Sequence, residues 1–204
     1  MRMRKKKWVH PFLEEEDRYL VRDPKEISYD KEVYLEIGMG MGDFITDSAK
    51  ENPEIFYVGL EKDETCVARA IIKAKEEGLE NFRVLLEDAS HIEELFPEKS
   101  VSRIYLHFSD PWPKSRTHKR RLTYPTFLKQ YEKILKDEGK IIFKTDNEGL
   151  FLDTLEYLKE SPFAILVEDR DYHKVERREP MTGYERRFVS QGQPIYFLEL
   201  GKKK

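Results

Sequence analysis

Residues 33–42 read VYLEIGMGMG, an apolar run that contains one acidic residue and ends in glycines at every second position. A strand that ends in such glycines predicts a strand-to-helix turn in which the backbone approaches a ligand closely. A dinucleotide-binding turn would have a glycine where this chain has Asp43. Because Asp43 and Glu36 both carry carboxylates, the turn favours a ligand with an amine or a positive charge over one with a pyrophosphate.

Short β-rich runs alternate with amphipathic stretches on either side of this turn, which is typical of a parallel sheet flanked by helices. Apolar runs suited to strands buried on both faces are found at 33–37, 56–60, 82–86, 103–108 and 140–144. Further strands are expected at 163–167 and 195–200, with helices ending at Gly78 and Gly139 and one near 150–159. The chain is therefore predicted to be an α/β protein.

The length of 204 residues suits one domain. We expect residues 1–30 to form a basic, partly flexible N-terminal arm and residues 31–204 to form the domain. Residues 168–194 are polar and rich in glycine and proline, which predicts a long functional loop.

Composition excludes several classes of protein. With Cys66 as the only cysteine, no internal disulfide and no multi-cysteine zinc site can form, and the five histidines lack the spacing of a helical metal motif. We therefore expect no metal, and we expect the histidines to be hydrogen-bonded or to face solvent.

No apolar stretch of about 18 residues is present, so we expect no membrane partner and a cytoplasmic location. The net charge of −3 means that any nucleic acid must be bound by local basic clusters. Whether the chain is a monomer or a homodimer stays open.

Acidic residues stand at the ends of three predicted strands, as Glu36, Glu61 and Asp88. The carboxyl ends of parallel strands meet at one edge of a sheet, so these side chains should line one crevice. Glu61 follows Gly38 by 23 positions. In nucleotide-binding sheets, an acid that accepts hydrogen bonds from ribose hydroxyls stands at about this spacing, roughly 20 residues after the glycine turn. Together they predict a ligand with an amine, a ribose and a base, although each acid alone is equally consistent with a helix cap.

From Val33 to Leu200, these features resemble those of the class I S-adenosylmethionine-dependent methyltransferases. The resemblance implies a Rossmann-like three-layer sandwich whose seven-stranded, mostly parallel sheet has an antiparallel last strand. It also implies that S-adenosyl-L-methionine is the cofactor, with Glu36 near the methionine moiety, Glu61 at the ribose and Asp88 facing the adenine amino group. Gly38 and Gly40 would form the turn beneath it.

The fourth predicted strand runs into an acidic, proline-rich turn at residues 108–114. Its prolines fix the backbone around Asp110, whose carboxylate can orient a purine, and around Trp112, which can stack on a base or simply pack. No acidic residue occurs from Pro111 to Arg121. This absence predicts a phosphate-binding strip, with a solvated charged loop as the alternative. The strip comprises Lys114, Arg116, His118, Lys119, Arg120 and Arg121.

Four segments narrow the resemblance to the tRNA (guanine-N7-)-methyltransferase family: residues 109–114, 118–122, 144–146 and 182–185. The resemblance implies that tRNA is the partner and that Asp110 is the catalytic-site residue and also touches the cofactor. The RNA substrate would be held by Lys114, Asp146, Thr182, Gly183, Tyr184 and Glu185. Asp146 is also a candidate helix N-cap. The chain departs from the family pattern at two positions. It has Met41 where many relatives have a lysine, and Gly183 where the family often has a larger residue.

The predicted reaction is methyl transfer from S-adenosyl-L-methionine to N7 of a guanine in tRNA, at position 46 of the variable loop by family resemblance. N7 already carries a free lone pair, so we expect positioning rather than proton removal to supply most of the rate. Three alternatives stay open: methylation of an exocyclic base amine, a non-catalytic RNA-binding protein, and an NAD-dependent dehydrogenase.

Overall fold

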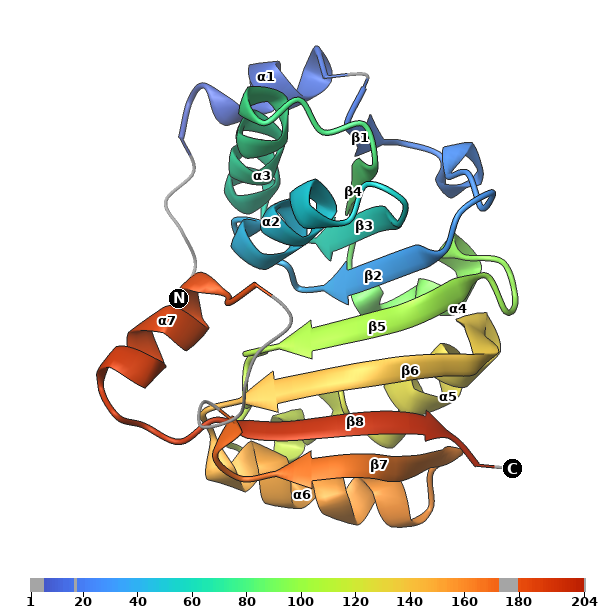
Figure 1. Cartoon of the computed structure of the whole chain (residues 1–204), viewed down its shortest axis with the longest axis vertical. Helices are drawn as coiled ribbons and strands as arrows, with labels where there is room; N and C mark the ends of the chain where they lie inside the picture. Colours follow the sequence, from blue (N-terminus) through green and yellow to red (C-terminus); the bar gives the residue numbers. More distant parts are fainter. Residues whose placement is uncertain (1–5, 17, 173–179, 204) are drawn as a thin grey trace.

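The computed structural model describes residues 6–16, 18–172 and 180–203. In these residues an eight-stranded sheet has the order β1-β4-β3-β2-β5-β6-β8-β7 and lies between two layers of helices (Figure 1). The strands are β1 (Leu20–Val21), β2 (Val33–Ile37), β3 (Phe56–Glu61), β4 (Phe82–Leu86), β5 (Val101–His107), β6 (Leu135–Thr145), β7 (Phe163–Asp169) and β8 (Tyr196–Lys202).

Each face of the sheet carries its own apolar cluster. One face is covered by α2 (Asp43–Glu51) and α3 (Glu64–Glu76), with α1 (Val9–Glu14) packed on α3. The other is covered by α4 (Ile92–Leu95), α5 (Pro125–Ile134) and α6 (Glu148–Lys159). Short 3-10 helices are η1 (Pro24–Glu26), η2 (Ala89–His91) and η3 (Ser115–Arg120). The last helix, α7 (Gly183–Ser190), lies beyond the carboxyl ends of β5 and β6 (Figure 1).

The predicted α/β class and sandwich are confirmed. Strands β1 to β6 pair in parallel, and the last strand, β8, is antiparallel to both β6 and β7. The sheet has one strand more than the seven expected, because the two-residue β1 pairs with the edge of β4. Such a short strand is too brief to show an apolar period in the sequence.

Within the segment expected to form a basic, partly flexible arm, residues 6–16 and 18–30 pack on the domain in this structure. Val9 and Leu13 are buried against the core, and Ile27 joins the cluster on the opposite face. The carbonyl of Tyr19 accepts a hydrogen bond from Val84 N at 2.8 Å, which fixes β1 on the sheet. The basic residues at positions 2, 4 and 5 lie outside the described residues.

The loop predicted at 168–194 is only partly a loop. Strand β7 extends to Asp169, and residues 183–190 form α7. Thr182 caps this helix, because its Oγ1 accepts a hydrogen bond from Glu185 N at 2.9 Å. Residues 173–179 lie outside the described part of the chain. The short helix escaped prediction because its apolar residues are few and do not form a long stripe.

Candidate active site

The glycine turn forms as the sequence predicts. Gly38, Gly40 and Gly42 all have positive φ, at 74°, 57° and 78°. A Cβ on Gly42 would lie 2.7 Å from Ala70 Cβ, so glycine here lets the start of α2 pack against α3. A Cβ on Gly40 would meet nothing within 4 Å, so Gly40 borders open space at the carboxyl edge of the sheet.

Three ionisable side chains lie buried at the carboxyl ends of neighbouring strands: Glu36 on β2 (2% exposed), His107 on β5 (6%) and Lys144 on β6 (1%). Glu36 Oε1 lies 3.2 Å from His107 Nδ1. Lys144 Nζ lies 3.4 Å from Glu185 Oε2, which links β6 to the completely buried carboxylate of α7. The second atoms, Glu36 Oε2 and His107 Nε2, have no hydrogen-bond partner among the described residues.

The surroundings favour the neutral forms of Glu36 and His107. Burial raises the pKa of Glu36 well above its ordinary value; Lys144 opposes this rise, while Glu61 and Asp43 reinforce it. Burial lowers the pKa of His107 well below its ordinary value, and the positive charge of Lys144 acts in the same direction. Buried polar atoms almost always have partners, so an unpartnered atom on each of two contacting residues points to a ligand.

A cleft of about 100 Å³ opens onto this pair. It is lined by Glu36, His107, the glycine turn at 38–41 and residues 182–184 before and within α7. A Cβ on Gly183 would lie 2.8 Å from Asp43 Oδ2, so glycine at this position lets α7 close against the start of α2. This approach gives a physical reason for glycine where a larger residue was expected. Met41, the other departure, lines the same cleft and is exposed.

The other two predicted cofactor carboxylates lie at the same edge but are more open. Glu61 Oε2 accepts a hydrogen bond from Gly40 N at 3.1 Å, and its Oε1 accepts from the backbone nitrogens of Lys62 and Asp63. Asp88 caps η2 by accepting from Ser90 N at 2.9 Å, so the capping alternative holds for this residue. A carboxylate has about four acceptor sites, so both side chains keep capacity for a ligand.

The turn that carries Asp110 is bounded by two strained aromatic residues. Phe108 and Trp112 have φ values of 48° and 41°, a left-handed conformation that is rare outside glycine and common at functional sites. Asp110 itself is exposed. The Phe108 ring stacks on Tyr184 and Phe188 of α7, with centroids 6.3 and 5.9 Å away. These contacts hold the Asp110 turn beside the helix that closes the cleft.

The basic strip divides into two parts. Most of its cationic residues are exposed: Lys114, Arg116, Lys119 and Arg120. The Arg120 guanidinium lies over the Trp112 ring, 5.0 Å from its centroid. Arg121, by contrast, is 3% exposed. It donates to Pro111 O at 2.7 Å, to the Asp153 carboxylate and to Tyr157 Oη. The predicted phosphate contact does not fit this placement, because Arg121 ties the Asp110 turn to α6.

The remaining predicted RNA-binding residues differ in exposure to solvent: some are exposed and others are buried. Asp146 is exposed after β6, and Asn147 rather than Asp146 caps α6, so the capping alternative for Asp146 is wrong. Tyr184 is 61% exposed. Thr182 and Glu185 are buried, so in this structure their side chains hold α7 in place and do not face an RNA.

The sequence interpretation missed two members of the site. His107 was expected to be satisfied or solvent-facing, and this is wrong because it is buried with Nε2 unpartnered. The signal was its position at the end of β5, the strand that pairs with β2, which carries Glu36 next to its last residue. Lys144 was noted only as part of a motif, yet its buried ammonium anchors α7. Among the described residues no group of histidine, cysteine and carboxylate side chains could hold a metal ion, and no helix is long and apolar enough to cross a membrane.

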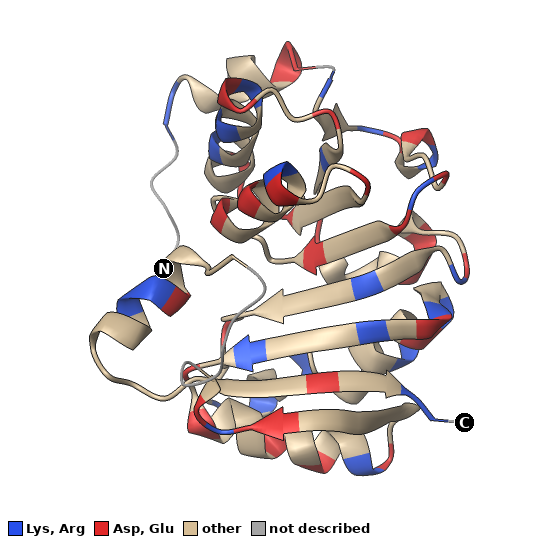
Figure 2. Cartoon of the chain, in the orientation of Figure 1, with Lys and Arg blue, Asp and Glu red and all other residues tan. Residues whose placement is uncertain are grey.

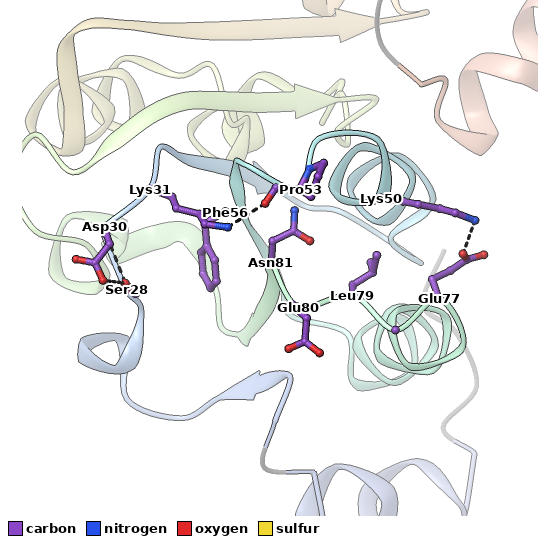
Figure 3. Close-up of a pocket in the computed structure, with 11 residues that line it drawn as sticks. Ser28, Asp30, Lys31, Lys50, Pro53, Phe56, Glu77, Leu79, Glu80 and Asn81 are labelled. Atoms are coloured by element: carbon purple, nitrogen blue, oxygen red, sulfur yellow. Dashed lines mark hydrogen bonds and ion pairs between the residues drawn. The ribbon is translucent and has the colours of Figure 1, made fainter.

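A larger hollow, of about 480 Å³, lies at the opposite end of the sheet, beside Phe56 and Asn81 at the amino ends of β3 and β4 (Figure 3). Its polar groups are already used: Lys31 Nζ donates to Pro53 O at 2.9 Å, and Lys50 pairs with Glu77. None of its described lining residues has a buried polar atom without a partner. The chemistry therefore points to the carboxyl edge as the candidate active site.

Comparison with known proteins identifies the family of this chain. Residues 30–198 match a family described as "Putative methyltransferase". The chain is 40% identical over 209 residues to the tRNA (guanine-N(7)-)-methyltransferase of Bacillus velezensis, covering 98% of this chain and 96% of that protein. It is also 40% identical over 205 residues to the protein of the same name from Oceanobacillus iheyensis, covering 96% of both. Its fold is similar to a solved antibiotic-related methyltransferase, with a TM-score of 0.65, 18% identity, and coverage of 87% of this chain and 96% of that one.

Proposed function

We propose that this chain, which belongs to the tRNA (guanine-N(7)-)-methyltransferase family, transfers a methyl group from S-adenosyl-L-methionine to N7 of a guanine in tRNA. The observation that carries the proposal is the similarity to enzymes of that name over nearly the whole chain. By family resemblance, the target is position 46 of the variable loop. In this proposal residues 31–204 form the catalytic domain, and the protein acts in the cytoplasm.

The residues at the carboxyl edge fit the cofactor. Glu36 Oε2 is a buried acceptor without a described partner, and a carboxylate is a suitable partner for the cofactor's ammonium group. The enclosed cleft is small and suits the amino-acid end, while Glu61 and Asp88 at the open edge suit the ribose hydroxyls and the adenine amine. Gly38 and Gly40 let the backbone approach the ligand. When bound, the cofactor supplies an electrophilic methyl group.

Asp110 is proposed to orient the acceptor base. Guanine N7 has a free lone pair, so this chain needs to place the base in line with the methyl group and no side chain needs to remove a proton. The exposed Asp110 carboxylate can accept hydrogen bonds from N–H groups on the guanine edge. Phe108 and Trp112, whose backbones are strained, bound the turn and restrict its backbone around Asp110.

The exposed part of the basic strip is proposed to bind the tRNA backbone. Acidic and basic residues are mixed over the ribbon (Figure 2), and the net charge is −3, so a polyanion must be attracted by a local cluster. Lys114, Arg116, Lys119 and Arg120 form such a cluster directly after the Asp110 turn. Asp146 and Tyr184, which are both exposed at the carboxyl edge, complete the proposed RNA-facing side.

The test is incubation of the protein with methyl-labelled S-adenosyl-L-methionine and unmodified tRNA, followed by digestion and nucleoside analysis. We expect the label in 7-methylguanosine and none in a transcript whose target guanosine is replaced by adenosine. Label in an N2-methylated guanosine or in another base would show a different methyltransferase. Cofactor binding without labelling of any tRNA would show a non-catalytic RNA-binding protein.

A further inference from the structure

Arg121 is a buried arginine whose guanidinium joins two parts of the molecule. It is 3% exposed, although it directly follows two exposed cations in the chain. On one side, Nε donates to Pro111 O at 2.7 Å and Nη2 lies 3.5 Å from Trp112 O. On the other side, Nη1 donates to the Asp153 carboxylate and, at 3.1 Å, to Tyr157 Oη, both on α6. The planar guanidinium has five donors in fixed directions, so one side chain holds this turn and α6 in one relative position.

The backbone of the Asp110 turn has little support of its own. Within the part of the chain that the structure describes, residues 109–113 make no backbone–backbone hydrogen bond. Two of these residues are prolines, which have no N–H to donate. Trp112 in addition has a left-handed φ of 41°, a strained conformation that persists only where the surroundings impose it. The two backbone oxygens that Arg121 contacts are therefore a main point at which the fold fixes this turn.

The two residues after Arg121 connect the same stretch of chain to the proposed cofactor site. Leu122 packs against the glycine turn, because its Cδ1 lies 3.8 Å from the position that a Cβ on Gly38 would occupy. Thr123 is buried, and its Oγ1 lies 2.8 Å from Oγ1 of Thr154 on α6. Three successive side chains therefore contact the proposed acceptor turn, the proposed cofactor turn and the helix that supports both.

We propose that Arg121 is a positioning residue for methyl transfer: it holds the Asp110 turn in a fixed place relative to the glycine turn, and Asp153 holds its guanidinium. The inference rests on the proposed function, since it assigns a further residue to the same reaction. In-line transfer needs the acceptor base and the methyl group in one geometry, so a small displacement of the turn costs much of the rate. Arg121 touches neither ligand and acts through Asp110. Loss of its bonds therefore lowers the rate and leaves the affinities for cofactor and tRNA unchanged.

The experiment measures single-turnover methylation at saturating tRNA and S-adenosyl-L-methionine. Arg121→Lys keeps the charge but loses the planar fork, so its side chain cannot bond to the turn and to α6 together. We expect the rate to fall about tenfold or more, while the Kd values for tRNA and S-adenosylhomocysteine change less than about twofold. Arg83→Lys is the matched control, because Arg83 also donates to two backbone oxygens, those of Glu80 and Phe82, at the amino end of the sheet. It should alter neither the rate nor the affinities.

Two further variants separate positioning of Asp110 from general support of the fold. Asp110→Ala removes the group that Arg121 is proposed to place, so adding Arg121→Lys to it should slow methylation by less than about a further twofold. Asp153→Asn keeps the size of the side chain and an acceptor oxygen but removes the charge that holds the guanidinium. Its side chain is 43% exposed, so the variant can fold, and it should slow methylation about threefold with unchanged affinities. Rates are compared per folded molecule, well below the unfolding temperature of each variant.

An unchanged rate in Arg121→Lys would overturn the inference, and if that variant does not fold, an unchanged rate in Asp153→Asn would do so. A further tenfold loss on adding Arg121→Lys to Asp110→Ala would also overturn it, as would a loss of affinity as large as the loss of rate. The proposed function fails separately. If the unaltered protein methylates guanine N7 and the variants do so at the same rate, only the positioning inference is wrong. If the unaltered protein does not methylate guanine N7, both proposals are wrong.

Discussion

The two ends of the sheet carry hollows of very different size and chemistry. The hollow at the amino end has about 480 Å³, and among its polar side chains Lys31 donates to Pro53 O, Lys50 pairs with Glu77 and Glu80 pairs with Arg18. The cleft at the carboxyl end has about 100 Å³, yet Glu36 and His107 each leave a buried polar atom unpartnered there. Volume alone would select the amino end. Groups that the described protein leaves unsatisfied identify the end where a ligand contributes the missing bonds.

Asn81 explains why the amino end is complete without a ligand. Its Nδ2 lies within hydrogen-bond distance of Ala49 O in the last turn of α2 and of Asn52 O and Ile55 O in the connection from α2 to β3. At the carboxyl end the corresponding loops carry carboxylates, glycines and the strained Asp110 turn. The proposed function assigns stability to the amino end and binding to the carboxyl end, and substitutions at each end can test this division.

The largest effect is expected for Asp110→Ala. Without the carboxylate the acceptor base is misplaced, and single-turnover methylation of tRNA should slow about 100-fold or more. Affinity for tRNA should fall far less, because the exposed cations after the turn remain. The matched control at the amino end is Asp30→Ala, which should leave the methylation rate unchanged.

A tRNA with 7-deazaguanosine at the target position tests the chemistry of the same step. This base keeps the edge that Asp110 can bind but lacks the nucleophilic nitrogen. The tRNA that contains it should bind with normal affinity and accept no methyl group. Methylation of the deaza substrate at a normal rate would remove N7 as the acceptor, and full single-turnover activity of Asp110→Ala would remove Asp110 from the mechanism.

Glu61→Ala should reduce affinity for S-adenosylhomocysteine by about 1.5–3 kcal/mol, because it removes a charged acceptor for ribose hydroxyls. It also removes the bond that holds Gly40 N in the glycine turn. Calorimetry against Glu80→Ala, a carboxylate removed from the amino-end hollow, provides the comparison. Equal affinities in the two variants would show that Glu61 serves only the local backbone.

Local patterns were sufficient to predict the strand-end carboxylates. A buried strand is a short apolar run, and parallel topology brings the ends of such runs to one edge, so Glu36, Glu61 and Asp88 could be grouped from sequence. The pairing of Lys144 with Glu185 could not, because it joins a strand to a helix 41 positions later. The lowered pKa of His107 could not be predicted either, because it results from burial of the side chain in the folded protein.

Arg121 shows the same limit within a single run of charges. In the sequence it is one of several adjacent cations, and nothing in the run separates it from Arg120. Only the packing of α6 against the Asp110 turn gives Arg121 the Asp153 and Tyr157 partners that bury it. The two-residue strand β1 was missed for a related reason, because its pairing with β4 determines its conformation.

A smaller effect is expected when Lys119 and Arg120 are both replaced by alanine. Each cation that neutralises one phosphate contributes about one to the slope of log affinity against log salt, so the double variant should lower that slope by about two. Filter binding should therefore show weaker, less salt-sensitive tRNA binding. Affinity for S-adenosylhomocysteine should not change. Arg121→Ala should instead lower the thermal unfolding temperature and leave the slope intact, since that side chain is buried. An unaltered slope in the double variant would place the phosphates elsewhere.

The smallest effect on catalysis is expected for Asn81→Ala at the amino end. The variant loses a buried donor shared by three carbonyls, so the free energy of unfolding measured in urea should fall by about 1–3 kcal/mol. Methylation per folded molecule, assayed well below the unfolding temperature, should equal that of the unaltered protein, because the carboxyl edge is untouched. If Asn81→Ala instead lost turnover at unchanged stability, the amino-end hollow would take part in the reaction, and the division between the two ends of the sheet would be wrong.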